Sequence, residues 1–374
     1  MTTLEAPASS LIDLIHQLGP TFESRAAAND AADRFGEEDF DDLKANGVLS
    51  AGVPTELGGA GASVSELAAM LTALARYSSS TALALSMHTH QVGIPAWRWR
   101  NEGGVGEPLL KRVAAENIVL VSSGGSDWLD SSGTLTKVEG GYRMNARKVF
   151  SSGSPVGDLL VTSAVLDDPA DGPTVLHFAV PLRSDAVRVG DNWRVLGMRA
   201  TGSNDVIIED LFVPDAAIGG RRPKRTWGIF HLVMKIAIPL IYSVYLGIAE
   251  KARDTALELA AKKRDDAETR LNVGEMENAL RAARLAHREM IHLAETAAPG
   301  PDTTNEIAIL RTLTGDAALA TVEKAMVVAG GAGFFRSTGL ERLFRDVQAA
   351  RYHPLTEKKQ LDLTGRFALG LPIE

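Results

Sequence analysis

Residues 195–214 read VLGMRATGSNDVIIEDLFVP, and this stretch decides how the chain is divided. Residues 205–214 within it are rich in β-branched and aromatic side chains, which favour strands. The run is bounded by Gly202 at its start and Pro214 at its end, and both residue types commonly mark turns next to strands. The sequence therefore predicts a strand here, inside a larger region of the same character.

Strand-like alternation extends well beyond that stretch. Residues 134–150, TLTKVEGGYRMNARKVF, place two alternating runs around Gly140-Gly141, which is the pattern of a β-hairpin. Another β-rich run, LLVTSAV, occupies residues 159–165. We therefore expect a middle β-domain, a barrel or a sandwich, over residues 117–224.

Both flanks of the β-domain have the 3.6-residue apolar period of helices. In residues 1–116 a Gly/Pro loop interrupts the pattern, and Ser63 and Glu66 after it form a capping-box pattern that marks a helix start. In residues 225–374 long segments rich in Ala, Leu, Glu and Arg predict an antiparallel four-helix bundle. The predicted fold class is α+β and multidomain: an N-terminal helical domain, the β-domain, and a C-terminal bundle.

Composition excludes several classes of protein. With 374 residues, 45% of them hydrophobic and 23% charged, the chain has the composition of a globular protein with a large core. Its net charge of −8 argues against nucleic acid as the main partner, because a phosphate backbone requires a concentrated basic face. The chain has no cysteine, which rules out disulfides, thiolate nucleophiles and cysteine-ligated metals. A cytoplasmic location is expected.

One apolar segment has the length of a membrane span. Residues 229–249 read IFHLVMKIAIPLIYSVYLGIA, but they include His231, Lys235 and Pro239. A lone span with such residues would be unusual in a chain of this kind. We predict a buried helix, with a membrane-associated helical protein as the alternative. The N-terminal segment lacks the pattern of a secretory signal.

Three polar or Gly-rich loops are either turns or contacts to a ligand. Residues 122–130, SSGGSDWLD, and residues 148–158, KVFSSGSPVGD, carry hydroxyls and glycines that suit turns and also suit hydrogen bonds to a polar ring. Residues 329–335, AGGAGFF, follow a helix, whereas the dinucleotide-binding fingerprint follows a strand. They predict a helix end, or amides that approach the phosphates of a cofactor.

Histidines occur at two places of interest. Residues 87–91, MHTHQ, hold His88 and His90, but positions two apart on a helix face different directions and no third ligand is near. No metal site is therefore expected. His353 stands near the end of a predicted basic helix, where it is either a general base or a complement to the helix dipole.

The order of these features resembles the acyl-CoA dehydrogenase family of flavoproteins over essentially the whole chain. The most specific part is the segment from Gly197 to Pro214, together with the pair Arg345-Asp346. The resemblance implies the fold of that family and an oxidoreductase that binds FAD, or alternatively FMN, and oxidises an acyl-CoA or a related small substrate. It also implies a homotetramer, or at least a dimer, because a neighbouring subunit completes such sites.

The resemblance further implies a set of site residues. The serine-rich loops match the segments that face the flavin, with Phe150 in place of a tryptophan of the family. Arg270 matches a residue that reaches the cofactor of a partner subunit, and the Gly-rich turn matches the adenosine end. The expected cofactor residues are Ser122, Ser123, Ser126, Phe150, Ser151, Ser152, Arg270, Gly330, Gly331 and Gly333. The expected substrate residues are His88, His90 and Trp97.

The catalytic glutamate of the family has no counterpart in this sequence. Its commonest position, nine residues after Arg345, is Pro354, and its alternative position aligns near Ala237. No carboxylate lies in residues 226–247. A positioned base contributes about 10²–10⁴-fold to a rate, so α,β-dehydrogenation would need a substitute. His353 and Glu357 are the nearby candidates, and His353 is the expected catalytic residue.

Three functions stay open at this point. The first is a dehydrogenase with a substitute base, which would pass electrons to an electron-transfer flavoprotein. The second is a reduced-flavin monooxygenase, which uses a flavin C4a-hydroperoxide, needs no such glutamate and depends on a flavin reductase. The third is a non-catalytic flavin-binding scaffold. A small molecule, for example a CoA thioester, is the expected substrate of the enzymes.

Overall fold

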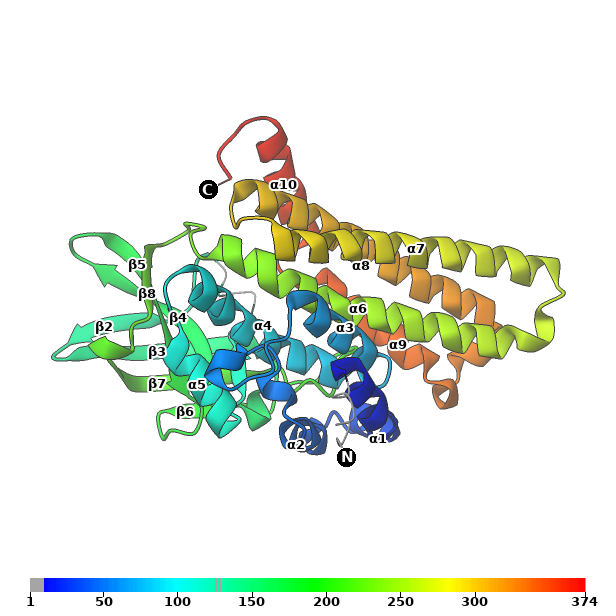
Figure 1. Cartoon of the computed structure of the whole chain (residues 1–374), viewed down its shortest axis with the longest axis horizontal. Coiled ribbons are helices and arrows are strands. Elements are labelled where there is room, and N and C mark those ends of the chain that lie inside the picture. Colours follow the sequence, from blue (N-terminus) through cyan, green and yellow to red (C-terminus); the bar gives the residue numbers. More distant parts are fainter. Residues whose placement is uncertain (1–9, 125–126, 128, 374) are drawn as a thin grey trace, which may run out of the picture.

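The computed structural model describes residues 10–124, 127 and 129–373. A helical region, a sheet and a second helical region follow one another, which confirms the predicted α+β architecture (Figure 1). In Figure 1 the sheet lies at one end of the long helices, and the N-terminal helices lie beside the junction. These N-terminal helices are α1 (Leu11–Ala31), α2 (Glu37–Ala45), α3 (Val64–Ala75), α4 (Ser79–Asn101) and α5 (Glu107–Glu116).

The capping box predicted at Ser63 is present at the start of α3. Ser63 Oγ accepts a hydrogen bond from the Glu66 amide at 3.2 Å, and Glu66 Oε2 accepts one from the Ser63 amide at 2.8 Å. The same arrangement joins Ser10 and Asp13 at the start of α1. These contacts satisfy amides that a helix start otherwise leaves without partners.

The described strands form one mixed sheet. They are β1 (Leu120–Ser122), β2 (Thr134–Val138), β3 (Gly141–Ser151), β4 (Leu159–Asp168), β5 (Gly172–Pro181), β6 (Val187–Val189), β7 (Asn204–Pro214) and β8 (Gly220–Pro223). Their order is β6-β7-β3-β2-β4-β5-β8, and β1 pairs in parallel with β4. β2 and β3 form the predicted hairpin, and the quoted run 205–214 lies in β7, antiparallel to β3.

The strand pairing joins segments that are distant in the sequence. β2 pairs with β3 on one side and with β4 on the other, and β1 joins the sheet at β4, off the main strand path. Alternation in a sequence predicts strands and the faces of their side chains. It does not predict which strands pair, so the strand order could not be derived from it.

The C-terminal region consists of long helices that run side by side, away from the sheet (Figure 1). They are α6 (Phe230–Ala260), α7 (Ala267–Thr296) and α8 (Pro301–Ala329), followed by α9 (Leu340–Val347) and α10 (Glu357–Ala368). α6 packs on α7 and α8, and also on α3 and α4. It therefore joins the two helical regions.

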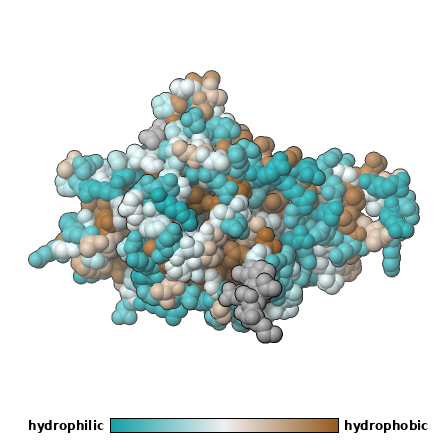
Figure 2. All heavy atoms as spheres, in the orientation of Figure 1, coloured by the Kyte–Doolittle hydropathy of each residue, from teal (hydrophilic) through white to brown (hydrophobic). Residues whose placement is uncertain are grey.

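The burial of α6 explains its apolar composition. Two helical segments of the described chain, Phe230–Lys263 and Pro301–Phe334, have the length and composition of a membrane span. The apolar part of the first is 94% buried inside the protein, which confirms the buried helix predicted from residues 229–249. Hydrophilic residues cover most of the face of the molecule seen in Figure 2. α6 is thus the central core helix, and its apolar faces pack against other helices.

Buried side chains connect all three regions. One hydrophobic cluster extends from α1, α3 and α4 through the sheet to the bundle, and a smaller one lies between α4, α5 and β1. Close packing of this kind fixes the elements around the junction of α4, α6 and the sheet relative to one another. A mainly apolar cavity lies at that junction.

Candidate active site

A cavity of about 570 Å³ lies where α4, the start of α6 and the sheet meet. Most of its wall is apolar, with a few polar groups among the apolar ones, which is the usual composition of a ligand site. Segments 193–198 and 348–354 complete the wall. Its lining includes His90 from α4, Ser123 after β1, Phe150 from β3, His177 from β5 and Ala237 from α6.

Phe150 reaches the cavity because of a β-bulge. Between Lys148 and Ser151 the register of β3 against β7 shifts, so two residues of β3 stand opposite one of β7. Phe150 has a φ of 58°, which costs a bulky residue on the order of 1–3 kcal/mol. It is 56% exposed and meets Trp193 edge-on, with ring centroids 5.8 Å apart. The strained backbone thus presents two aromatic rings beside the cavity.

Hydroxyl groups stand next to these rings. Ser152 Oγ lies 2.7 Å from Ser203 Oγ, which lies 2.6 Å from Thr201 Oγ1. Ser123 Oγ accepts a hydrogen bond from Thr162 Oγ1 at 3.0 Å. A hydroxyl can rotate to donate or to accept. The hydroxyls that line the cavity can therefore bind the polar edge of a ligand.

A buried ion pair joins Asp127 to β3. Lys148 Nζ donates to Asp127 Oδ2 at 2.6 Å, to the Ser163 carbonyl at 2.5 Å and to the Ser132 carbonyl at 2.6 Å. Burial lowers the pKa of Lys148, and the adjacent Asp127 opposes that change. Because the three donors of the ammonium are used, this lysine positions the wall and is not free to bind a ligand.

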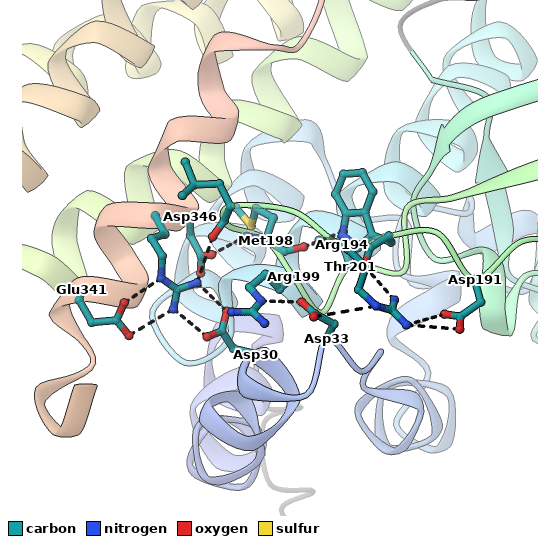
Figure 3. A network of polar contacts seen from close by, with 12 residues as sticks. Asp30, Asp33, Asp191, Arg194, Met198, Arg199, Thr201, Glu341 and Asp346 are labelled. Carbon is teal, nitrogen blue, oxygen red and sulfur yellow. Dashed lines mark hydrogen bonds and ion pairs between the residues drawn. The ribbon is translucent and has the colours of Figure 1, made fainter. Parts of the chain in front are cut away.

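Asp346 in α9 holds the segment 193–198 of the cavity wall (Figure 3). Asp346 is buried, and its Oδ1 accepts a hydrogen bond from the Met198 amide at 2.5 Å. Its other oxygen accepts one from Ser79 Oγ at the start of α4. Burial raises the pKa of this carboxyl. One side chain therefore joins the cavity wall, α4 and α9.

The neighbouring Arg345 lines the cavity, but its charge is paired. Its guanidinium donates to both oxygens of Asp30 in α1, at 3.0 and 2.7 Å, and to Glu341 at 2.7 Å. Gly197 approaches it so closely that an added Cβ would lie 2.2 Å from the Arg345 carbonyl oxygen. Bidentate pairing of this kind fixes geometry as well as charge. Arg345 and Asp346 thus tie three regions of the chain together around the cavity.

His353 lines the cavity and contacts a tyrosine of α6. Its Nε2 lies 2.5 Å from the Tyr245 hydroxyl. Burial of the ring, and then the nearby Arg311, lower the pKa of His353 to about 3, so the imidazole is neutral at physiological pH. Burial raises the pKa of Tyr245 well above its usual value, so the phenol keeps its proton. The pair is therefore uncharged.

Two further imidazoles line the cavity, and both are neutral. His90 is buried, its Nδ1 has no hydrogen-bond partner among the described residues, and burial lowers its pKa to about 3. His177 Nε2 accepts a hydrogen bond from Arg222 Nε at 3.0 Å, which assigns the imidazole proton to Nδ1. Burial, and then Arg222, lower the pKa of His177 to about 4. The cavity thus contains neutral hydrogen-bonding rings.

Among the described residues, no free carboxylate lines the cavity. Pro354 and Ala237, the positions where the resemblance would place a glutamate, both lie in its wall. Asp127 is the one carboxylate in the described part of the lining, and it is paired with Lys148. The site can therefore orient a ligand and exchange protons through neutral groups, but these residues supply no anionic base.

The residues expected from the sequence divide into those that line the cavity and those that do not. The lining contains Ser122, Ser123, Phe150, Ser152, His90 and His353. Ser126 lies outside the described residues. His88 stays away from the cavity, because its ring is held between the Leu49 carbonyl and the Leu120 amide, at 2.8 and 3.0 Å.

Ser151 and Trp97 are also absent from the described lining. Ser151 is fully buried, and its hydroxyl points back toward the Lys148 carbonyl at 3.4 Å. Trp97 lies between α4 and α6, where the Lys235 ammonium sits 5.3 Å from its ring centroid. Spacing along a strand or helix predicts a face, but a bulge or a local partner changes which side chain reaches a cavity.

Arg270 and the Gly-rich turn lie elsewhere in the bundle. Arg270 is exposed near the start of α7, and Gly330 follows α8 close to Lys263, just beyond the end of α6. Neither they nor Gly331 and Gly333 line the cavity. Within a single chain these positions therefore take no part in the site.

The structure also adds residues that sequence reasoning missed. His177, Trp193 and Tyr245 lie in or directly behind the cavity wall, although each stands outside any motif. The sequence held one signal of a polar cluster near these residues. Lys148 lies in a predicted strand and is fully buried in the structure, and a buried lysine requires a charged or polar partner.

The residues present fit a flavin. Phe150 and Trp193 offer apolar surface to a flat aromatic system, and the hydroxyls of Ser123 and Ser152 stand beside them for its polar edge. The planar head of a flavin has both features. The cavity is also large enough to hold such a head together with a small second molecule.

Comparisons with known proteins agree with this fit. The family model of the acyl-CoA dehydrogenase N-terminal domain matches residues 20–103, and that of the acyl-CoA dehydrogenase C-terminal domain matches residues 240–358. Amino sugar nitrososynthase DnmZ of Streptomyces peucetius is 30% identical, over 96% of this chain and 93% of that protein. Dibenzothiophene monooxygenase of Mycolicibacterium goodii is 27% identical, over 91% and 89%.

A solved structure shares the architecture along nearly the whole chain. KijD3 in complex with FMN and dTDP-3-amino-2,3,6-trideoxy-4-keto-3-methyl-D-glucose superposes with a TM-score of 0.89 and 27% identity, over 99% of this chain and 96% of that one. This family binds a flavin, and that flavin can be FMN or FAD. The chain belongs to the acyl-CoA dehydrogenase family and is a flavin-dependent oxidoreductase.

Proposed function

We propose that this protein is a reduced-flavin-dependent monooxygenase and not an acyl-CoA dehydrogenase. The observation that carries the proposal is the composition of the cavity wall. Removal of an α-proton from a thioester requires a positioned base. Pro354 and Ala237 occupy the two positions aligned with that base, and the one described lining carboxylate, Asp127, is bound to Lys148.

The uncharged pair of His353 and Tyr245 suits proton transfer in such a reaction. When Tyr245 donates its hydroxyl proton to His353 Nε2, the histidine carries its own proton on Nδ1. His353 can then donate to, or recover a proton from, a group in the cavity without becoming a stable cation. A bound reduced flavin supplies the two electrons that, with O₂, place one oxygen atom on the substrate and the other in water.

Other groups would hold the ligands. Ser123 and Ser152 would bind the polar edge of the flavin, and Phe150 with Trp193 would contact its ring system. The apolar wall of α6 would exclude water from the reacting atoms. The monooxygenase and nitrososynthase among the relatives support this assignment for the chain as a whole.

Two parallel measurements on the flavin-loaded protein test the proposal. We expect no bleaching of the flavin when acyl-CoAs of several chain lengths are mixed in anaerobically. We expect oxygen-dependent product when reduced flavin is supplied with candidate substrates. Bleaching by any acyl-CoA would support the dehydrogenase instead, and a protein that binds no flavin would support the scaffold.

The proposal includes partners. A flavin reductase would supply the reduced cofactor, whereas an electron-transfer flavoprotein would have no role.

We also propose a homo-oligomer with a tetramer as the expected form, in which Arg270 and the Gly-rich turn of one chain meet the cofactor of another. The exposed Phe334 and Phe335 beside that turn, 85% and 66% accessible, support a contact surface there. Light scattering of the purified protein tests this point, and a monomer would contradict it.

A further inference from the structure

We infer that the substrate is an uncharged, largely apolar ring compound, and that neither a nucleotide diphosphate nor a CoA thioester binds productively in this cavity. The inference rests on the proposed function for the type of reaction, but it concerns binding and is tested by binding. The charges of the described lining residues are its first support.

Every charged group in the described lining is already neutralised by a fixed partner. Asp127 is paired with the buried Lys148 at 2.6 Å. Arg345 is paired with Asp30 at 2.7 Å and with Glu341 at 2.7 Å. A phosphate could recruit Arg345 only by leaving the carboxylate of Asp30 without its partner, and removing one member of a buried pair is strongly unfavourable.

The polar lining groups outside these ion pairs are neutral. His90 Nδ1 lacks a partner among the described residues, and His177 keeps its proton on Nδ1 because Arg222 occupies Nε2. The hydroxyls of Ser152 and Ser203 bond to each other. Such groups suit one or two hydrogen bonds to a neutral molecule. Their hydrogen bonds do not offset the free-energy cost of removing a doubly charged diphosphate from water.

Most of the rest of the wall is hydrocarbon. α4 contributes Leu83, Met87 and Ile94, and the first turns of α6 contribute Val233 and Ile238. Because the flavin head and the substrate must share about 570 Å³, the substrate portion inside the cavity is small. A compact apolar ring buries its surface favourably there.

Two exposed residues of the cavity wall are also apolar or aromatic. Leu196 and Tyr352 stand in this wall and are 65% and 75% exposed. They offer an apolar approach, whereas a mouth that binds phosphate requires cations or amide donors. A long anionic substrate would thus find no unpaired charge among the described lining residues.

Titration of the oxidised, flavin-loaded protein without reductant tests the inference. Binding is followed by the change in the flavin absorption spectrum, with three probes: indole, thymidine diphosphate and butyryl-CoA. We expect indole to bind at least about tenfold more tightly than either anion. Equal or tighter binding of thymidine diphosphate or butyryl-CoA would overturn the inference.

A pair of variants tests the physical cause. Gln348 lines the cavity and makes only weak contacts, to the Phe344 carbonyl at 3.2 Å and from Arg351 at 3.5 Å. Gln348→Lys adds one cation to the wall, and Gln348→Met is the neutral control of similar length. We expect the lysine variant to bind thymidine diphosphate about tenfold more tightly, because a charged hydrogen bond is among the stronger ones, while the methionine variant keeps the original ranking. No gain from the lysine would refute the charge argument.

The outcomes separate this inference from the proposed function. If indole binds preferentially but no ring compound is oxygenated with reduced flavin and O₂, the proposed reaction fails and the substrate class stands. If an amino sugar nucleotide is oxygenated while neutral rings are neither bound nor oxygenated, the reaction stands and the substrate class fails.

Discussion

At the scale of single residues, the described cavity lining holds neutral groups, and Pro354 and Ala237 stand where the resemblance would place a carboxylate. His90, His177 and His353 are all held uncharged, by burial and in two cases by a nearby arginine. Phe150 is held at a positive φ so that its ring stands beside Trp193. Each of these features depends on partners that lie far apart in the sequence.

The contact between Tyr245 and His353 gives a prediction at this scale. Tyr245→Phe removes the hydroxyl at 2.5 Å from His353 but keeps the ring, so it removes a proton-transfer partner with little change in packing. We expect kcat to fall by about 10–10²-fold, within the range of general acid–base contributions, with flavin affinity unchanged. Single-turnover kinetics with reduced flavin measures the effect.

The control is another tyrosine–histidine pair in the same chain. Tyr77 contacts His16 Nδ1 at 2.9 Å, away from the cavity, so Tyr77→Phe should leave kcat unchanged. Equal effects of the two substitutions would show that His353 and Tyr245 have no special part in the reaction.

At the scale of elements, the cavity wall depends on how the segment 193–198 is fastened to α9. Asp346 Oδ1 accepts a hydrogen bond from the Met198 amide (Figure 3). Gly197 lies against the Arg345 carbonyl. The bulge in β3 also shapes the wall, because it turns the Phe150 side chain out of the regular alternation of the strand. The wall is therefore set by contacts between elements more than by any one element.

Substitution of Gly197 tests this fastening. In Gly197→Ala the new Cβ would lie 2.2 Å from a backbone oxygen, so the loop must move away from α9. We expect a loss of about 1–3 kcal/mol in the free energy of unfolding, with weaker flavin binding because the wall moves. Thermal unfolding and flavin titration measure both effects.

Gly274 in α7 provides the matched control. An added Cβ there meets nothing within 4 Å, so Gly274→Ala should stabilise the helix by about 0.5–1 kcal/mol. A Gly197 variant as stable as this control would mean that the close approach of the loop to α9 is not required.

At the scale of the whole molecule, buried histidines link stability to pH. His287, between α6 and α7, bonds to Ser243 Oγ at 2.9 Å, and burial lowers its pKa to about 4. An unfolded histidine titrates near 6.5. Between these values the unfolded chain binds a proton that the folded chain does not. The free energy of unfolding therefore falls as pH decreases from about 6.5 toward 4.

Chemical denaturation at pH 7 and pH 5 tests this linkage. The loss of stability on acidification should be smaller in His287→Gln than in the parent, by about 2 kcal/mol, because about 1.4 kcal/mol is lost per pH unit and histidine. His292 is exposed on the same helix, so His292→Gln should leave the loss unchanged. The same loss in His287→Gln as in the parent would contradict the assignment of a neutral, buried imidazole.

The class of fold, the buried helix at residues 229–249, the hairpin around Gly140-Gly141 and the capping box at Ser63 could all be predicted from the sequence. These features are local, because periodicity, turn residues and caps act within a few residues of one another. The absence of a carboxylate at positions 354 and 237 could also be read from the sequence once the family was recognised.

Which side chains share the cavity follows from the packing of distant segments and could not be predicted from the sequence. It brought His177, Trp193 and Tyr245 to the site, kept His88 and Trp97 out of its described lining, and joined the strands into one sheet. The same packing makes the lining histidines neutral and pairs its charges with fixed partners. These properties depend on burial and on contacts between distant segments, which local sequence patterns do not encode.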